Sequence, residues 1–257
     1  MKNRFRSCAF ILFLSCLVNS PFLQAAELKI VCGVAPYENI FEKIKDKYEK
    51  ETKNTLKFIG DIPKNGADVS FSKVLSGEAE IGSAAIPIDG WLKIVKEKKL
   101  ADDKQIGEIT HRVLGKDLMK VFSHKDVGVT KLTLDQAKQI FTGEKKNWKD
   151  FGGKDVEIKI VLQSTYPATN TFFKTKIMSG TDFPKTVLNE NSVPAMIEKV
   201  SKTPGGVGFV SNMLKTPDAN TIETNEVIGR PITAIVKGKP SELAQAFFNF
   251  VAKEVKQ

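Results

Sequence analysis

The stretch "KIVLQSTYPATNTFF", residues 159–173, places polar side chains where an apolar run gives way to a helical pattern. Gln163 closes the apolar run, and Thr169 stands where the helical pattern begins. Backbone N–H groups at a helix start have no partner within the helix, and the helix dipole makes that end positive, so it attracts anions. The turn between Gln163 and Thr169 contains neither Arg nor Lys. The stretch therefore predicts an anion site built from hydrogen-bond donors instead of full charges.

Residues suited to catalysis or metal binding are scarce. His111 and His124 are the two histidines, and no further Cys or His near them completes a set of metal ligands. The sequence has no GxSxG nucleophile motif, and Asp102 and Asp103 lie in a charged, solvated stretch. We therefore expect a binding protein, not an enzyme, with no metal or other cofactor.

Short apolar runs alternate with amphipathic segments along the chain. The runs that predict strands are "ELKIVCG", "TLKFIG", "AEIGSAA", "ITHRVLG", "LMKVFSH", "VEIKIVLQ", "GGVGFVS" and "RPITAIVKG", with "GKD" separating the fourth from the fifth. Helical spacing predicts helices over residues 37–52, 68–76, 170–178, 192–201 and 240–256. A capping box at Thr133 and Gln136 predicts another helix, and Asp89 is expected to cap a helix that ends near residue 98. This alternation predicts α/β layers with right-handed crossovers.

Four loops of this predicted sheet are placed to hold a ligand. In open α/β sheets, ligands lie beyond the carboxyl ends of the strands. That rule selects the loops after "KIVCG", "LKFIG", "EIGSA" and "KIVLQ". The candidate ligand-binding residues in or beside these loops are Ala35, Tyr37, Gly66, Ser70, Ser83, Gln163 and Thr169. Each also has a structural interpretation as a cap, turn or packing residue, and Trp148 is favoured as a packing residue.

The first 26 residues have the order of a secretory signal peptide. "MKNRFR" is basic, "AFILFLSCLV" is a short apolar core, and "PFLQAA" supplies small residues before Glu27. The apolar core is too short for a comfortable bilayer span. An uncleaved anchor and a lipoprotein processed at Cys16, after "FLSC", remain open as alternatives. We expect cleavage after Ala25 or Ala26 and a periplasmic or secreted protein.

The chain beyond residue 26 has modest positive charge and a single cysteine. Cleavage would remove three basic residues and no acidic one, which lowers the formal net charge from +9 to +6. Cys32 would remain alone in "LKIVCGV", where a buried, inert thiol is favoured. Lysines alternate with acidic residues at helical spacing, as in "EKIKDKYEKETK", so we expect solvated helix faces and no nucleic-acid partner. The remaining positive charge would attract an anionic solute.

Four segments resemble, in order, those of the phosphate-type (PstS-like) periplasmic solute-binding proteins. They are "SGEAEIGSAAIP", "QIFTGEKKNWKDFGG", "GGVGFVS" and "RPITAIVKGKPSELAQAFFNFV", and together they extend over nearly the whole chain after residue 26. The resemblance implies an α/β, two-lobed type II periplasmic binding protein fold with a ligand cleft between the lobes. Residues 27–115 and 230–257 would form lobe one, and residues 116–229 would form lobe two. Closure of the lobes on one solute would precede delivery to an ABC importer.

The loop at residues 163–169 departs from the family pattern. In the family, an Arg followed after a spacer by Ser-Gly-Thr surrounds the oxyanion. By this resemblance, Gln163 stands in the place of the Arg, and Pro167, Ala168 and Thr169 stand in the place of Ser-Gly-Thr. Gln163 brings no charge, and Pro167 has neither a hydroxyl nor a backbone N–H. The loop therefore offers fewer donors than the family pattern.

Lobe one departs from the family pattern as well. Gly66, Ser70 and Ser83 keep their expected places, whereas Ala67 stands where Ser is expected. The loop "GVAPYE" lacks the usual Ser or Thr. The leading hypothesis is a monomeric periplasmic protein that captures a small oxyanion, phosphate or related, for the membrane subunits of an ABC importer. The alternative is the same fold reused as a non-transport sensory or interaction protein with a different small ligand or none.

Overall fold

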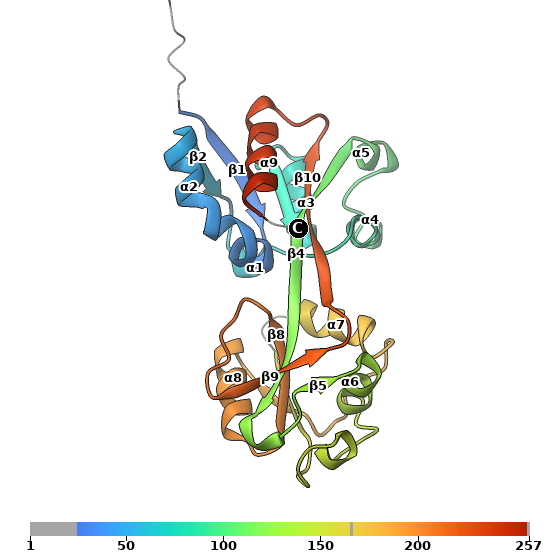
Figure 1. Cartoon of the computed structure of the whole chain (residues 1–257). Helices are drawn as coiled ribbons and strands as arrows, with labels where there is room; N and C mark the ends of the chain where they lie inside the picture. Colours follow the sequence, from blue (N-terminus) through green and yellow to red (C-terminus); the bar gives the residue numbers. More distant parts are fainter. Residues whose placement is uncertain (1–24, 165–166, 256–257) are drawn as a thin grey trace, which may run out of the picture.

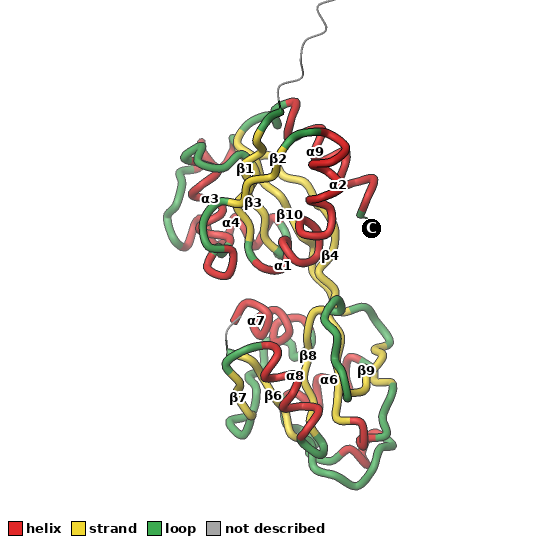
Figure 2. Tube along the Cα trace, turned by 90° about the vertical axis from the view of Figure 1, so that its left-hand side faces the viewer, coloured by secondary structure: helices red, strands yellow, loops and turns green. Residues whose placement is uncertain are grey.

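Two lobes joined by two long strands make up the chain. The computed structural model describes residues 25–164 and 167–255, with side chains for 25–164 and 169–255. Figure 1 shows lobe one above lobe two, and Figure 2 shows the same separation after a quarter turn. This arrangement confirms the predicted two-lobed α/β fold. The predicted signal peptide falls almost entirely on residues 1–24, which lie outside the described residues.

Lobe one is built from the beginning and the end of the described chain. Its parallel strands are β1 (Glu27–Cys32), β2 (Thr55–Phe58) and β3 (Ile81–Ala84). A continuous helical run starts with α1 (Val34–Pro36), passes through a π-helical segment (Tyr37–Phe41) and ends with α2 (Glu42–Thr52). Its other helices are a 3-10 turn (Ile62–Lys64), α3 (Ala67–Leu75), α4 (Ile88–Glu97), α5 (Asp103–Gly107) and α9 (Glu242–Glu254).

Lobe two repeats the plan of three parallel strands covered by helices. Its strands are β5 (Lys131–Leu132), β6 (Lys159–Gln163), β7 (Leu188–Glu190), β8 (Gly206–Ser211) and β9 (Ala219–Thr224). Its helices are α6 (Leu134–Phe141), α7 (Pro167–Lys176) and α8 (Val193–Lys202), with 3-10 turns at Lys125–Val127 and Trp148–Phe151. Parallel β7, β6 and β8 correspond to parallel β2, β1 and β3 of lobe one.

The strands β4 (Ile109–His124) and β10 (Ile228–Lys237) run from one lobe to the other (Figure 1). They pair antiparallel along their common length, within the strand order β2-β1-β3-β10-β4-β8-β6-β7. The prediction of two strands interrupted at "GKD" is therefore wrong, because β4 is continuous through these residues. The pairing register shifts between Ile232 and Thr233, which leaves Leu114 as an extra residue in β4. A local bulge of this kind lets β4 continue next to the residues where the sequence pattern suggested a break.

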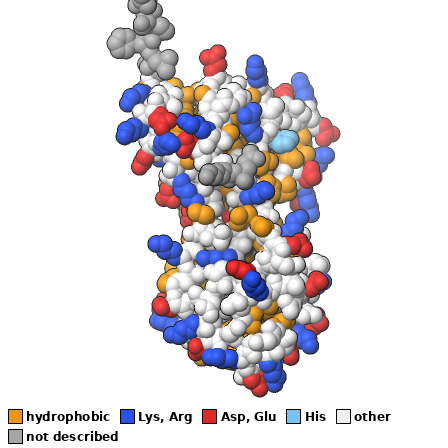
Figure 3. Space-filling model, viewed as in Figure 1, with side chains coloured by type: hydrophobic (Ala, Val, Ile, Leu, Met, Phe, Trp, Pro, Cys, Tyr) orange, Lys and Arg blue, Asp and Glu red, His pale blue; other side chains and the backbone are white. Residues whose placement is uncertain are grey.

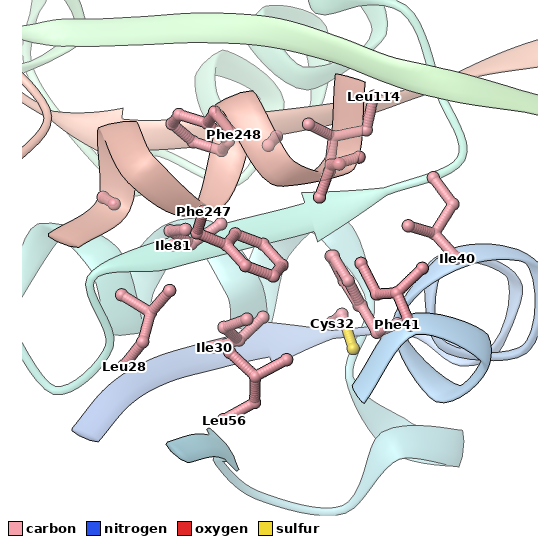
Figure 4. Packing of buried hydrophobic residues seen from close by; sticks show 14 of the residues in the cluster. Leu28, Ile30, Cys32, Ile40, Phe41, Leu56, Ile81, Leu114, Phe247 and Phe248 are labelled. Atoms are coloured by element: carbon pink, nitrogen blue, oxygen red, sulfur yellow. The ribbon is translucent and has the colours of Figure 1, made fainter. Parts of the chain in front are cut away.

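Aromatic side chains dominate the buried core of each lobe. In lobe one, Phe247 of α9 packs edge-on against Tyr48 of α2, with ring centroids 5.2 Å apart. Figure 4 shows Phe247 above the β1 side chains Leu28 and Ile30. In lobe two, Phe173 and Phe209 stack with centroids 3.9 Å apart. Burial of these large apolar surfaces stabilises each lobe around its own core.

Three local predictions can be compared directly with the structure. Trp148 is fully buried and donates from Nε1 to the Gly205 carbonyl oxygen at 2.9 Å, which confirms its packing role. Thr133 and Gln136 form the predicted capping box at the start of α6. The prediction for Asp89 is wrong, because Pro87 is the N-cap of α4 and Asp89 lies in the first turn. There its carboxylate faces the positive end of the helix dipole instead of accepting a capping hydrogen bond.

Candidate functional site

A cavity of about 970 Å³ lies between the two lobes. Residues from both lobes and from the crossing strands β4 and β10 line it. The loops after β1, β2, β3 and β6 all contribute lining residues, which are the four loops selected by the strand-end rule. In both ribbon views α1 lies on the edge of lobe one that faces lobe two, and α7 lies on the facing edge of lobe two. The cavity is therefore formed where strand ends and helix starts of the two lobes face each other.

Helix starts bring backbone donors to this cavity. The first bond of the helical run after β1 is from the Tyr37 N–H to the Gly33 carbonyl oxygen, so the N–H groups of Val34 and Ala35 precede the helical hydrogen-bond ladder. Both residues line the cavity. In α3, the first such bond is from Ser70 N–H to Gly66, and Ala67 at the helix start also lines the cavity. Helix starts of this kind favour negative charge.

Two loops of lobe one meet at Gly33 and Asn65. A Cβ atom on Gly33 would lie 2.8 Å from the Asn65 carbonyl oxygen, so only glycine fits this approach without a backbone shift. Asn65 is buried and donates from Nδ2 to the Ile59 carbonyl oxygen at 2.9 Å. This contact holds the start of α1 beside the start of α3. The sequence around Gly33 does not reveal that glycine is required there, because the contact joins residues in different loops.

A buried ion pair crosses the two strands at the base of the cavity. Arg230 of β10 donates from Nε to Oδ2 of Asp117 in β4 at 2.9 Å. Its Nη2 atom lies 2.9 Å from the same oxygen. Both residues are more than 90% buried and both line the cavity. Asn39 donates from Nδ2 to Asp117 Oδ1 at 3.3 Å. We call Asn39, Asp117 and Arg230 the cleft floor.

The cleft floor also contacts lobe two. The Arg230 guanidinium lies over the Phe172 ring of α7, with its carbon 5.3 Å from the ring centroid. Sequence reasoning missed Arg230 and Asp117, because they are 113 residues apart and belong to strands whose pairing the sequence does not reveal. The one available signal is that Asp117 and Arg230 lie at the predicted lobe boundaries. A charged residue at a lobe crossing would lie near an interlobe cleft.

Four of the seven predicted site residues line the cavity: Ala35, Gly66, Gln163 and Thr169. Gln163 is almost fully buried, and its backbone carbonyl oxygen accepts from Asn170 Nδ2 at 2.8 Å. This bond ties the end of β6 to α7. The structure therefore brings the two residues of the opening stretch to the same cavity as the loops of lobe one. Their contact with a ligand stays a prediction.

The other three predicted residues do not belong to the described cavity lining. Tyr37 packs edge-on against Phe58, with ring centroids 5.1 Å apart. Ser70 is fully buried on α3, and Ser83 is fully buried on β3 and donates to the Thr233 carbonyl oxygen at 3.1 Å. The structure thus does not bring these three side chains to the described cavity lining, and their contact with a ligand stays a prediction. Tyr37 and Ser70 lie on helical segments that follow strands, and Ser83 lies within β3. Helix phase and strand alternation direct their side chains into lobe one.

Charges around the cavity are mixed in sign. Lys64 pairs with Asp61 at 3.0 Å, and Lys202 pairs with Glu198 within α8. Figure 3 shows Lys and Arg side chains interspersed with Asp and Glu on the visible face of both lobes. Among the residues with described side chains, no group of three or more His, Cys, Asp or Glu is arranged to hold a metal ion. The cleft floor and the helix starts thus supply the anion-attracting features of the cavity.

Glu38 is a titratable residue on the cavity lining. Partial burial raises its pKa, and the nearby carboxylates of Glu42 and Asp117 raise the pKa further. Lys43 opposes this effect. The neutral form of Glu38 is therefore favoured over a wider pH range than for a solvated glutamate.

The two lobes, the two crossing strands and the interlobe cavity define a protein of the periplasmic-binding-protein class. A family model described as PBP superfamily domain matches residues 27–225, so the chain belongs to the PBP superfamily. The names of curated relatives are more specific than that of the family model. The chain is 27% identical over 210 residues to "Phosphate-binding protein PstS" of Bacillus subtilis (strain 168). It is 30% identical over 179 residues to the protein of the same name in Staphylococcus epidermidis (strain ATCC 12228 / FDA PCI 1200).

These alignments cover only part of each relative. The first covers 75% of this chain and 65% of the relative, and the second covers 68% of this chain and 51% of the relative. The chain therefore spans about half to two thirds of the length of these curated relatives.

Solved structures share the fold over nearly their full length. One is an ABC-type phosphate transport receptor from Vibrio cholerae, with a TM-score of 0.64, 20% identity and coverage of 89% of this chain and 94% of that chain. Another is a putative phosphate ABC transporter substrate-binding protein with bound phosphate from Clostridium perfringens, with a TM-score of 0.65, 19% identity and coverage of 89% and 93%. At this level of identity, the likeness establishes the two-lobed type II fold.

Proposed function

We propose that this protein captures a phosphate-type oxyanion between its two lobes and delivers it to the membrane subunits of an ABC importer. The observation that carries this proposal is the buried Arg230 on a cavity that the helix starts at Val34 and Ala67 also line. A desolvated oxyanion needs several donors and at least partial charge compensation. The names of the PstS relatives and of the two phosphate receptors support the same solute class.

The proposed site divides its tasks among three kinds of group. Arg230 supplies positive charge, held in direction by Asp117. Backbone N–H groups at Ala35 and near Gly66 supply donors from lobe one. Gln163 and Thr169 supply side-chain donors from lobe two. In this assignment a hinge-strand arginine takes over the charge that Gln163 cannot provide.

Lobe closure is the proposed capture step. Lobe one comprises residues 27–115 and 230–257, lobe two comprises residues 116–229, and the lobes rotate about β4 and β10. Two lobes that each hold part of the ligand are stabilised against each other when both contact it. The protein acts as a monomer in this scheme, and no catalytic step is required.

Export is part of the same proposal. Residues 1–26 act as a signal peptide, and the remaining chain works in the periplasm or outside the cell. In the described part of the chain, no helix has both the length and the apolar character needed to cross a bilayer. The basic, apolar and small-residue order of the first 26 residues supports this route.

Calorimetric titration of the purified protein with phosphate, sulfate and molybdate tests the proposal. We expect saturable binding of at least one of these oxyanions and a higher melting temperature at saturation, since a ligand that binds the folded state stabilises it. Neither heat nor a melting shift with any of the three would count against oxyanion capture.

A further inference from the structure

The walls of the cavity differ chemically from its floor. The floor carries the charged and amide groups of Asn39, Asp117 and Arg230. The walls carry apolar side chains from two segments of each lobe, and we call them the apolar wall. Its members are Ile86, Ile94, Val193, Ile197, Val210 and Leu214.

The apolar wall begins about three residues farther along β4 than the cleft floor. In the β4–β8 pairing, Val210 lies opposite Lys120, three residues along β4 from Asp117. At a strand rise of about 3.4 Å per residue, this places Val210 roughly 10 Å from the level of Asp117. On the other side of the cavity, Ala84 at the end of β3 pairs with Thr233 of β10, three residues from Arg230. A ligand that touches the floor and exceeds a few atoms in length therefore meets apolar side chains.

Four members of the apolar wall, Ile86, Ile94, Val193 and Leu214, are only partly buried by their own lobe, whereas Ile197 and Val210 are buried. Ile86 packs at the edge of one lobe-one cluster, and Val193 and Leu214 pack at the edge of one lobe-two cluster. Ile94 on α4 is half-buried and lines the cavity. Lys202 and Glu198 also line the cavity, where they pair with each other and are exposed. The apolar wall therefore presents apolar side chains, whereas an oxyanion in the same place would need hydrogen-bond donors.

The size of the cavity points the same way. A tetrahedral oxyanion has five heavy atoms, whereas 970 Å³ lies at the upper end of the range of about 300–1,000 Å³ for cavities that hold drug-sized ligands. A free oxyanion away from the floor would lose water without gaining hydrogen bonds. A hydrocarbon group in the same position would gain from leaving water.

We propose that the cleft is specific for an oxyanion that carries a hydrocarbon group, as an organic phosphonate or phosphomonoester does. The oxyanion binds at the cleft floor, and the hydrocarbon group lies along the apolar wall. This inference rests on the proposed function for the position of the oxyanion. It adds that inorganic phosphate fills only the polar part of the site.

A series of ligands with one head group tests the inference. Phosphate, methylphosphonate, butylphosphonate and phenylphosphonate are titrated into the purified protein by calorimetry under identical conditions. We expect affinity to rise along the alkyl series by about fourfold for each methylene that is buried. Phenylphosphonate should also bind more tightly than methylphosphonate.

Variants of the apolar wall test whether the hydrocarbon group gains its affinity from these side chains. Ile94→Asn and Leu214→Asn should each reduce the advantage of butylphosphonate over methylphosphonate by several-fold, with little change for phosphate. Each side chain is partly exposed, so the variants are expected to fold, and their melting curves check this. Val227→Asn is the matched control, because Val227 is 78% exposed and does not line the cavity.

Three results would overturn the inference, and they differ in what they say of oxyanion capture. Phosphate binding at least as tightly as every organic ligand would refute the apolar subsite and leave oxyanion capture intact. If both wall variants retain the affinity advantage of butylphosphonate over methylphosphonate, the hydrocarbon group binds elsewhere. That result would refute the assignment of the hydrocarbon group to the apolar wall. Binding of none of the four ligands, and of neither sulfate nor molybdate, would refute both proposals together.

Discussion

The buried pair of Arg230 and Asp117 is the most informative feature at the scale of single residues. Removing two charges from water is costly, and a buried ion pair often stabilises a fold less than apolar residues of the same size would. Here the pair lies on the cavity and in the strands that connect the lobes. In the proposed site, an arginine held in this position would offer a fixed positive charge to an anion, which would give the pair a role beyond stability.

Variants of this pair separate its structural role from its binding role. Arg230→Gln alone leaves Asp117 buried without its cation and should lower the free energy of unfolding by about 3–5 kcal/mol. The double variant Arg230→Gln/Asp117→Asn keeps hydrogen-bonding groups and removes both charges, so it should recover most of that stability. Its affinity for oxyanions should nevertheless fall at least tenfold. Urea denaturation and calorimetric titration measure the two effects.

Arg112→Gln serves as the control for loss of one arginine charge, since Arg112 is an exposed residue of β4 outside the cavity lining. It should leave oxyanion affinity unchanged. If the double variant folds and binds oxyanions as tightly as the unaltered protein, Arg230 does not provide the charge for the ligand.

Glu38 gives a pH dependence with a defined sign. Its raised pKa means that it becomes charged at higher pH than a solvated glutamate, and the charged form repels an anion in the cavity. Affinity for sulfate should therefore fall as pH rises through the pKa of Glu38. Glu38→Gln should flatten this part of the profile. A profile in Glu38→Gln with the same slope as in the unaltered protein would assign the dependence to another group.

At the scale of elements, the site depends on how closely loop ends approach each other. The loops after β1 and β2 touch at Gly33 and Asn65, and this contact aligns two helix starts on the cavity. The side chain at each strand end matters less than the backbone geometry there. In the proposed site, backbone N–H groups would therefore let a loop such as "GVAPYE" serve an anion without a Ser or Thr.

Substitution of Gly33 tests this contact. In Gly33→Ala the new methyl group would lie 2.8 Å from a backbone oxygen that cannot rotate away. We expect a loss of about 1–3 kcal/mol in the free energy of unfolding, together with weaker oxyanion binding. Gly107→Ala is the matched control, because its Cβ atom would meet nothing within 4 Å. Equal stability and affinity in the two variants would show that the loops have room to separate.

At the scale of the whole molecule, two lobes with separate cores connected by β4 and β10 can move as rigid bodies. The cores of lobe one and lobe two share no residue in the described chain. The cavity between them is large enough that a small oxyanion cannot touch all its walls at once. Closure would bring donors of both lobes to the ligand.

Small-angle X-ray scattering tests closure directly. We expect the radius of gyration to decrease when a bound oxyanion saturates the protein, and to stay unchanged in the double variant Arg230→Gln/Asp117→Asn under the same conditions. Ligand binding with an unchanged radius of gyration would indicate a site formed without lobe movement.

Local pattern was sufficient for the α/β class, most elements and the position of the cleft. Strand and helix periodicities are properties of neighbouring residues, so "KIVLQ" and the helix pattern after it could be interpreted without knowledge of the rest of the chain. The strand-end rule selected the loops that contain or adjoin Gln163, Thr169, Ala35 and Gly66. In the structure these four residues line the same cavity. The family resemblance added the two-lobed arrangement.

Tertiary structure alone decided the features that depend on distant residues. β4 is one strand because β10 pairs with it through the predicted break. Tyr37, Ser70 and Ser83 turn into lobe one because side-chain direction follows the exact helix phase and strand register, which a loop position does not specify. In the proposed site, the charge that the 163–169 loop lacks comes from Arg230, which meets Asp117 only when strands from distant parts of the chain pair.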